Sequence, residues 1–168
     1  MDIFIININE ANSVSKDLLQ EFGYKHFSNK QNERIHRFAY LMSDRILKDF
    51  YHIENPIFDY GAEKPVLKNN EKHFSISHSG EYIAIVFSDY ACGIDIEQTK
   101  DRDYKKISKR MGFESISLKD FYLNWTEFEA KYKLGCNAEA VHRFEIPNYM
   151  ITAVSNYKND SCEIYYSL

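Results

Sequence analysis

Cysteine and long apolar runs are both scarce in this sequence of 168 residues. The three cysteines, Cys92, Cys136 and Cys162, are odd in number and lack the paired spacing of metal ligands. We interpret them as reduced thiols in a cytoplasmic protein. No apolar run is long enough to span a membrane, and the first residues lack the layout of a signal peptide. No repeat and no low-complexity segment is visible.

Positive charge is also in short supply. Lysine and arginine number 21 against 25 aspartates and glutamates, which gives a formal charge of −4. This balance argues against a nucleic-acid partner bound mainly through its phosphates. Apolar material is ample, because 44% of the residues are hydrophobic and 15% are aromatic. A chain of this length forms one domain, or two small halves that share a core.

Strand-like and helix-like segments alternate along the chain. We expect residues 93–97 to return as a strand alongside residues 82–87, and Asn159-Asp160 to form a hairpin turn. Helices that interrupt groups of antiparallel strands indicate an α+β fold. The pattern predicts strands at residues 3–8, 73–79, 82–87, 93–97, 141–146, 149–155 and 162–166, and helices at 13–22, 29–51, 101–110 and 117–134.

Two carboxylates stand two positions apart in the strand predicted at residues 93–97. Side chains two apart in a strand point to the same face, so Asp95 and Glu97 lie side by side, with Ile94 and Ile96 buried behind them. Two like charges held that close cost free energy unless a proton or a cation intervenes. Mg2+ prefers such oxygen ligands. The alternative is a solvated strand face without a ligand.

A second row of side chains is predicted on the helix at residues 117–134. Trp125, Glu129 and Lys133 are spaced four residues apart, so they share one face of that helix. Taken alone, the row is explained by a core tryptophan beside an ordinary Glu–Lys pair, which is worth about 0.3–0.5 kcal/mol.

Three motifs in a fixed order give the chain a family resemblance. They are Phe-Ser-Ile-Ser-His-Ser-Gly at 74–80, Gly-Ile-Asp-Ile-Glu at 93–97 and Trp-Thr-Glu-Phe-Glu-Ala-Lys-Tyr-Lys at 125–133. Together they resemble the 4′-phosphopantetheinyl transferases, in the branch whose two similar halves lie in one chain. The N-terminal half resembles the family less closely, through its first strand, its long helix and a Gly-x-x-Lys-Pro turn at 61–65.

The resemblance implies a reaction and a fold. The phosphopantetheine arm of coenzyme A moves to a serine of an acyl- or peptidyl-carrier protein of fatty-acid, polyketide or peptide synthesis. The reaction needs Mg2+ and releases 3′,5′-ADP. Two similar α+β halves, residues 1–92 and 93–168, are expected around a pseudo-twofold axis, with coenzyme A in the cleft between them. Such a single-chain pseudo-dimer implies a monomer.

The same resemblance assigns roles to residues of this chain. Asp95, Glu97 and Glu129 are the implied Mg2+ ligands. Glu129 is also the implied general base for the carrier serine, and Lys133 is implied to hold a phosphate oxygen. The implied catalytic residues are therefore Asp95, Glu129 and Lys133.

Coenzyme A has its own implied contacts. His78 would donate to the 3′-phosphate, and Lys64, in a turn-rich connection at residues 55–65, would meet the same phosphate. The full implied set for coenzyme A is Arg34, Lys64, Ser77, His78 and Lys133.

The chain departs from the family motif at Phe128, where the family has a lysine beside the catalytic glutamate. The departure leaves two alternatives open. One is a degenerate relative that binds coenzyme A or a carrier without efficient catalysis, and the other is a different Mg2+-dependent phosphoester enzyme with the same carboxylates. Four basic residues either steer an acidic carrier protein or form a solvated helix face: Lys105, Lys106, Lys109 and Arg110.

Overall fold

Helices and strands alternate along the chain, and the fold is α+β. The computed structural model describes residues 1–23, 28–60, 66–68 and 72–166. The elements are β1 (Asp2–Asn7), a 3-10 helix η1 (Ile8–Ser13), α1 (Lys16–Gln20), α2 (Lys30–Asp49), β2 (Ile57–Asp59), β3 (Val66–Lys68), β4 (His73–Ser79), β5 (Tyr82–Ser88), β6 (Cys92–Gln98), α3 (Tyr104–Met111), α4 (Leu118–Leu134), β7 (Ala140–Ile146), β8 (Tyr149–Ser155) and β9 (Glu163–Tyr166).

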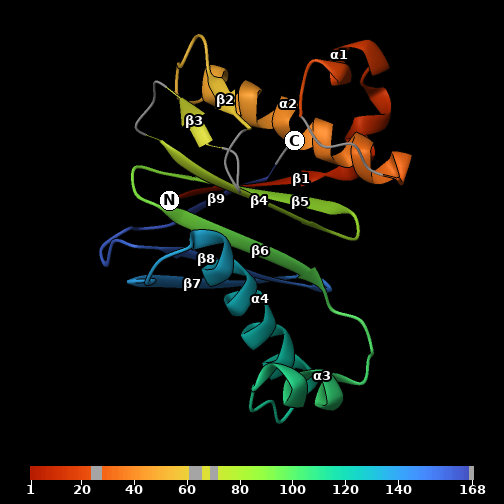
Figure 1. Ribbon diagram of the computed structural model, residues 1–168, viewed down its shortest axis with the longest axis vertical. Helices are drawn as coiled ribbons and strands as arrows, with labels where there is room; N and C mark the ends of the chain where they lie inside the picture. The colour runs from red at the N-terminus through yellow and green to blue at the C-terminus, as the bar shows by residue number, and fades with distance from the viewer. Residues whose placement is uncertain (24–27, 61–65, 69–71, 167–168) are drawn as a thin grey trace.

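Two sheets form the centre of the molecule (Figure 1). The first has the strand order β4-β5-β1-β9 and the second the order β6-β8-β7. In the first sheet β5 is antiparallel to both β4 and β1, whereas β9 runs parallel to β1. In the second sheet β8 is antiparallel to both of its neighbours. A small antiparallel pair, β2 with β3, lies apart from both sheets.

The elements stack in four layers, in the order α2, first sheet, second sheet, α4 (Figure 1). The apolar face of α2, including Leu47, is buried on the first sheet. The opposite face of that sheet, including Ile5, packs on Ile96 and its neighbours in the second sheet. On the outer face of the second sheet, Ala130 of α4 packs on Val154. Burial of these apolar surfaces holds the layers together.

The two sheets meet where β4 lies beside β6, although these strands belong to different sheets. Alternate residues of β4 supply hydroxyl groups there, namely Ser75, Ser77 and Ser79, which we call the serine seam. Ser75 Oγ accepts a hydrogen bond from Ile94 N at 3.3 Å, and Ser79 Oγ accepts one from Gln98 N at 3.0 Å. Side-chain oxygens therefore pair backbone groups that a neighbouring strand would pair within a sheet.

Local signals predicted most element positions correctly. The helix predicted at 117–134 is confirmed as α4. Ser117 Oγ caps it by accepting from Asp120 N at 3.1 Å, and Gly135 ends it in the left-handed conformation. The short helix predicted from Ser13 is wrong in its start, because residues 8–13 form η1 and Ser15 caps α1. Strands β2 and β3 were not predicted. No helix of the described residues has the length and apolar character needed to cross a membrane.

Two predicted pairings are wrong. β6 does not return beside β5, since β5 already has β4 and β1 on its two edges, and β6 pairs with β8 instead. No hairpin forms at Asn159-Asp160, because β9 crosses to the first sheet and pairs with β1. The Asp160 carboxylate accepts from Ser88 Oγ at 2.7 Å.

The chain changes sheets between β5 and β6, close to the predicted division at residues 92 and 93, yet β9 joins the sheet of the first half.

The three cysteines are free thiols in different environments. Cys92 is buried and Cys136 is exposed, and burial raises the pKa of Cys162 to about 11. At pH 8 the thiolate of Cys162 is therefore only about one part in a thousand. We expect N-ethylmaleimide to label Cys136 much faster than the other two, as measured by peptide mass spectrometry in the folded protein. Equal labelling of Cys136 and Cys162 would contradict this order, and labelling in urea provides the control.

Candidate functional site

The acidic pair lies on one face of β6. Asp95 is 5% exposed and Glu97 is half-buried, while Ile94 and Ile96 on the opposite face are buried between the sheets. The strand alternation predicted from the sequence is therefore confirmed. Burial raises the pKa of Glu97, and the negative charge of Asp95 raises it further, whereas hydrogen bonds to its carboxylate act in the opposite direction.

Lys133, in the last turn of α4, binds directly to this strand. Its Nζ donates to Asp95 Oδ1 at 2.8 Å, to Ser77 Oγ at 2.9 Å and to the carbonyl oxygen of Ile94 at 3.0 Å. Ser77 Oγ in turn donates to Asp95 Oδ1 at 2.7 Å. Residues from β4, β6 and α4 thus converge on one carboxylate oxygen, and the lysine compensates a charge that burial would otherwise make costly.

Glu97 is held by two neutral donors rather than by a cation. Trp125 Nε1 of α4 donates to Oε1 at 3.2 Å, and Ser79 Oγ of β4 donates to Oε2 at 3.0 Å. The row predicted on α4 therefore lies along the acidic pair. Trp125 contacts Glu97, and Lys133 contacts Asp95. The chain directions of α4 and β6 are therefore antiparallel at this contact.

The backbone of α4 lies directly on β6 at Gly93. A Cβ atom at this position would lie 2.1 Å from the carbonyl oxygen of Ala130 and 2.9 Å from the backbone nitrogen of Leu134. Only glycine leaves room for such a close approach. This contact sets how near the side chains of α4 come to the acidic pair.

Glu129 occupies the middle of the row on α4. It is one turn from Trp125 and one turn from Lys133, both of which contact β6, so its Cβ faces the same region. Its side chain is half-buried, and among the described residues its carboxylate makes no hydrogen bond or ion pair. A carboxylate so placed is available to accept a proton.

A divalent cation fits the donors at this site in part. Asp95 Oδ2 is buried and has no hydrogen-bond partner among the described residues, so it is an acceptor that a ligand could satisfy. Within the described ranges, no three His, Cys, Asp or Glu side chains are grouped closely enough to hold an ion; the predicted grouping of Glu129 with Asp95 and Glu97 is therefore not formed in this structure. Two carboxylates still suit Mg2+, which commonly takes one or two of them and completes its shell with water and phosphate oxygens.

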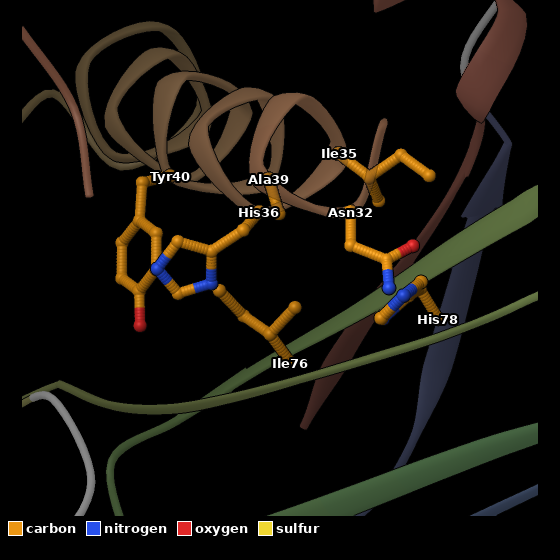
Figure 2. Close-up of a pocket in the computed structure, with 7 residues that line it drawn as sticks. All are labelled: Asn32, Ile35, His36, Ala39, Tyr40, Ile76 and His78. Atoms are coloured by element: carbon orange, nitrogen blue, oxygen red, sulfur yellow. The ribbon is translucent and has the colours of Figure 1, made fainter. Parts of the chain in front are cut away.

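A cavity of about 190 Å3 opens between α2 and β4. His78 lines one end, and Figure 2 shows Asn32 of α2 directly beside it. Burial lowers the pKa of His78, Lys133 lowers it further, and Asp95 acts in the opposite direction. The imidazole is thus neutral at pH 7 and lies close enough to the Lys133–Asp95 pair for both charges to act on it. The lining residues are Asn32, Ile35, His36, Ala39, Tyr40, Ile76 and His78.

Arg34, which was predicted to contact coenzyme A, does not lie beside His78. The Arg34 guanidinium donates to the carbonyl oxygens of Ala11 at 2.6 Å and Val14 at 3.0 Å, which ties η1 to α2. Arg34 also lines a different hollow from the one that His78 lines. Lys64 lies outside the described residues.

Phe128 and the basic helix lie on the outer side of the site. Phe128 is 40% exposed and packs edge-to-face on Phe113, with ring centroids 5.7 Å apart, so no cation replaces the family lysine at this position. The basic residues of α3 are exposed and form no ion pair within the described part of the chain: Lys105, Lys106, Lys109 and Arg110.

Sequence reasoning missed three contributors to the site. Ser79 was not assigned, although the alternating serines of residues 75–79 were a signal that one side of β4 is polar. Trp125 was weighed only as a core residue, and Gly93 was given only as the first residue of a motif. No family model matches the chain, and no curated protein matches it. Functional inference therefore depends on the geometry of these residues.

Proposed function

We propose that the protein is a Mg2+-dependent 4′-phosphopantetheinyl transferase, which moves the phosphopantetheine arm of coenzyme A to a serine of a carrier protein. One observation carries the proposal. Lys133 and the buried acidic pair form a charged site, and His78, on which the charges of Lys133 and Asp95 both act, lines the cavity between α2 and β4. Coenzyme A carries its pyrophosphate and its 3′-phosphate on the same nucleotide, so a charged site close to a histidine-lined cavity matches it.

The acidic pair suits the pyrophosphate of coenzyme A. A divalent cation held by Asp95 and Glu97 would neutralise the charge that develops on the leaving phosphate. The open Oδ2 atom of Asp95 supports this assignment, because a buried carboxylate oxygen without a partner costs about 1–3 kcal/mol unless a ligand satisfies it. Glu129, one turn from Lys133, is proposed as a group that acts through a bound water.

The remaining roles, phosphate binding and proton transfer, are assigned to side chains of this protein. Lys133 presents an ammonium group beside the pyrophosphate, where it can exchange part of its contact with Asp95 for a phosphate oxygen. The neutral His78 ring donates one N–H to the 3′-phosphate at the mouth of the cavity. Glu129, which has no partner among the described residues, accepts the proton of the carrier serine.

The architecture is compatible with two similar halves around a pseudo-twofold axis. Each sheet carries one long helix on its outer face, α2 or α4, and the sheets meet at the serine seam. The exposed basic residues of α3 support an acidic carrier as the partner, since the chain as a whole is acidic. A monomer is part of the proposal.

The function is tested by incubating the purified protein with coenzyme A, Mg2+ and several apo-carrier proteins, followed by mass spectrometry of the carriers. The expected result is a mass gain of one phosphopantetheine arm, dependent on Mg2+ and accompanied by 3′,5′-ADP. A variant with Asp95→Asn is the matched control. Tight carrier binding without any mass gain would instead support a binding protein, which the exposed Phe128 favours. Release of 3′,5′-ADP without a carrier would support a hydrolase.

A further inference from the structure

The carboxylate of Glu97 is fixed from two sides by different elements. Ser79 of β4 reaches Oε2 at 3.0 Å, and Trp125 of α4 reaches Oε1 at 3.2 Å. Each oxygen receives one neutral donor and keeps a second lone pair. The orientation of Glu97 is therefore determined by two groups that do not compete with a cation.

Both donors are themselves held in place. Ser79 Oγ accepts from Gln98 N at 3.0 Å while it donates to Glu97, so its rotamer is set by the neighbouring strand. The Trp125 ring is stacked on Phe121, with centroids 5.9 Å apart and planes at 30°, and this stack sets the direction of its N–H. A donor that is already ordered loses little conformational entropy when it orients a carboxylate.

We infer that Ser79 and Trp125 are positioning residues, which hold the Glu97 carboxylate beside Asp95 in the orientation that a divalent cation requires. The inference rests on the proposed function for the presence of the cation. Outer groups that orient metal ligands typically change metal affinity by about 10- to 100-fold when they are removed. Neither residue needs to touch the cation or the substrate.

The direct test is Mn2+ binding, measured by electron paramagnetic resonance on the full-length protein, with the metal alone as the probe. We expect Ser79→Ala and Trp125→Phe each to weaken Mn2+ binding by about tenfold or more. Phenylalanine keeps a ring to stack on Phe121 and removes the N–H donor together with part of the indole volume. Ser79→Thr, which restores the hydroxyl, should bind Mn2+ nearly as the parent does.

Ser75→Ala is the matched control. It removes an acceptor from Ile94 N just as Ser79→Ala removes one from Gln98 N, so both changes disturb the seam similarly. Only Ser79 also donates to Glu97. We therefore expect similar losses of thermal stability in the two variants, with Mn2+ affinity reduced only in Ser79→Ala.

Trp125 supplies a second readout, because it is the only tryptophan in the chain. Its emission should change when Mg2+ is added to the parent or to Ser75→Ala, and should not change in Glu97→Gln. Equal Mn2+ affinity in the parent, Ser79→Ala and Trp125→Phe would overturn the inference, as would a parent that binds no Mn2+. If Mn2+ binding falls as expected while no carrier is modified, the proposed function fails and the positioning roles stand.

Discussion

Replacing Asp95 by asparagine is expected to lower phosphopantetheine transfer by about 10²- to 10³-fold. The carboxylate is 5% exposed, accepts from Lys133 and Ser77 through Oδ1, and leaves Oδ2 open. Asparagine keeps the size of the side chain but removes the negative charge. The rate is measured by mass spectrometry of the carrier under single-turnover conditions. A parental rate in this variant would remove Asp95 from the reaction.

The effect of Asp95→Asn on the stability of the protein has to be separated from its effect on the transfer rate. In Asp95→Asn the Lys133 ammonium keeps Ser77 Oγ and the Ile94 carbonyl but loses its contact with a charged carboxylate. The cost should be less than the about 3–5 kcal/mol found when fully buried pairs are broken, because the Lys133 side chain is 28% exposed. The double variant Asp95→Asn/Lys133→Met removes both charges. It should regain part of the stability in urea unfolding without regaining transfer.

Gly93→Ala is expected to destabilise the protein by at least about 3 kcal/mol. The new Cβ would lie 2.1 Å from the Ala130 carbonyl oxygen, and the atoms it meets are backbone atoms of α4, which cannot rotate away as a flexible side chain would. Relief requires α4 to move off β6, which would also separate Lys133 from Asp95. The free energy of unfolding in urea measures the first effect, and the transfer rate of the folded fraction measures the second.

Gly112→Ala is the control for this change. Gly112 has a φ of +75° and nothing within 4 Å of a built Cβ, so alanine there meets strain but no clash. Its cost should be about 1–2 kcal/mol, as for other residues forced into the left-handed region. If the two variants were equally stable, the close approach of α4 to β6 would not have the effect assigned to it.

The elements that were predictable are those whose signals are local. Ser117 and Gly135 lie at the ends of α4 in the sequence, and the alternation around Asp95 and Glu97 already places both on one face of a strand. The pairing of β6 with β8 was not predictable in this way, because residues 99–148 separate the two strands and nothing local identifies the partner.

The site residues also divide into features that local sequence signals predict and features that only the fold determines. The spacing of Trp125, Glu129 and Lys133 places them on one face of α4, but only the fold places that face on β6. Arg34 illustrates the reverse case. The family resemblance implied a nucleotide contact for Arg34, yet its partners are backbone carbonyls of residues 11 and 14, which have no signature in the side-chain sequence.

The serine seam gives the junction between the sheets a mechanical property that a continuous strand ladder would lack. Hydroxyl groups on β4 bind β6 across the junction, so a change in the spacing of these two strands acts on side-chain hydrogen bonds while every inter-strand backbone pair inside each sheet stays intact. His78 belongs to the strand on one side of this junction and Asp95 to the strand on the other. Any change in the distance between them therefore loads the serine seam before it loads the backbone pairing of either sheet.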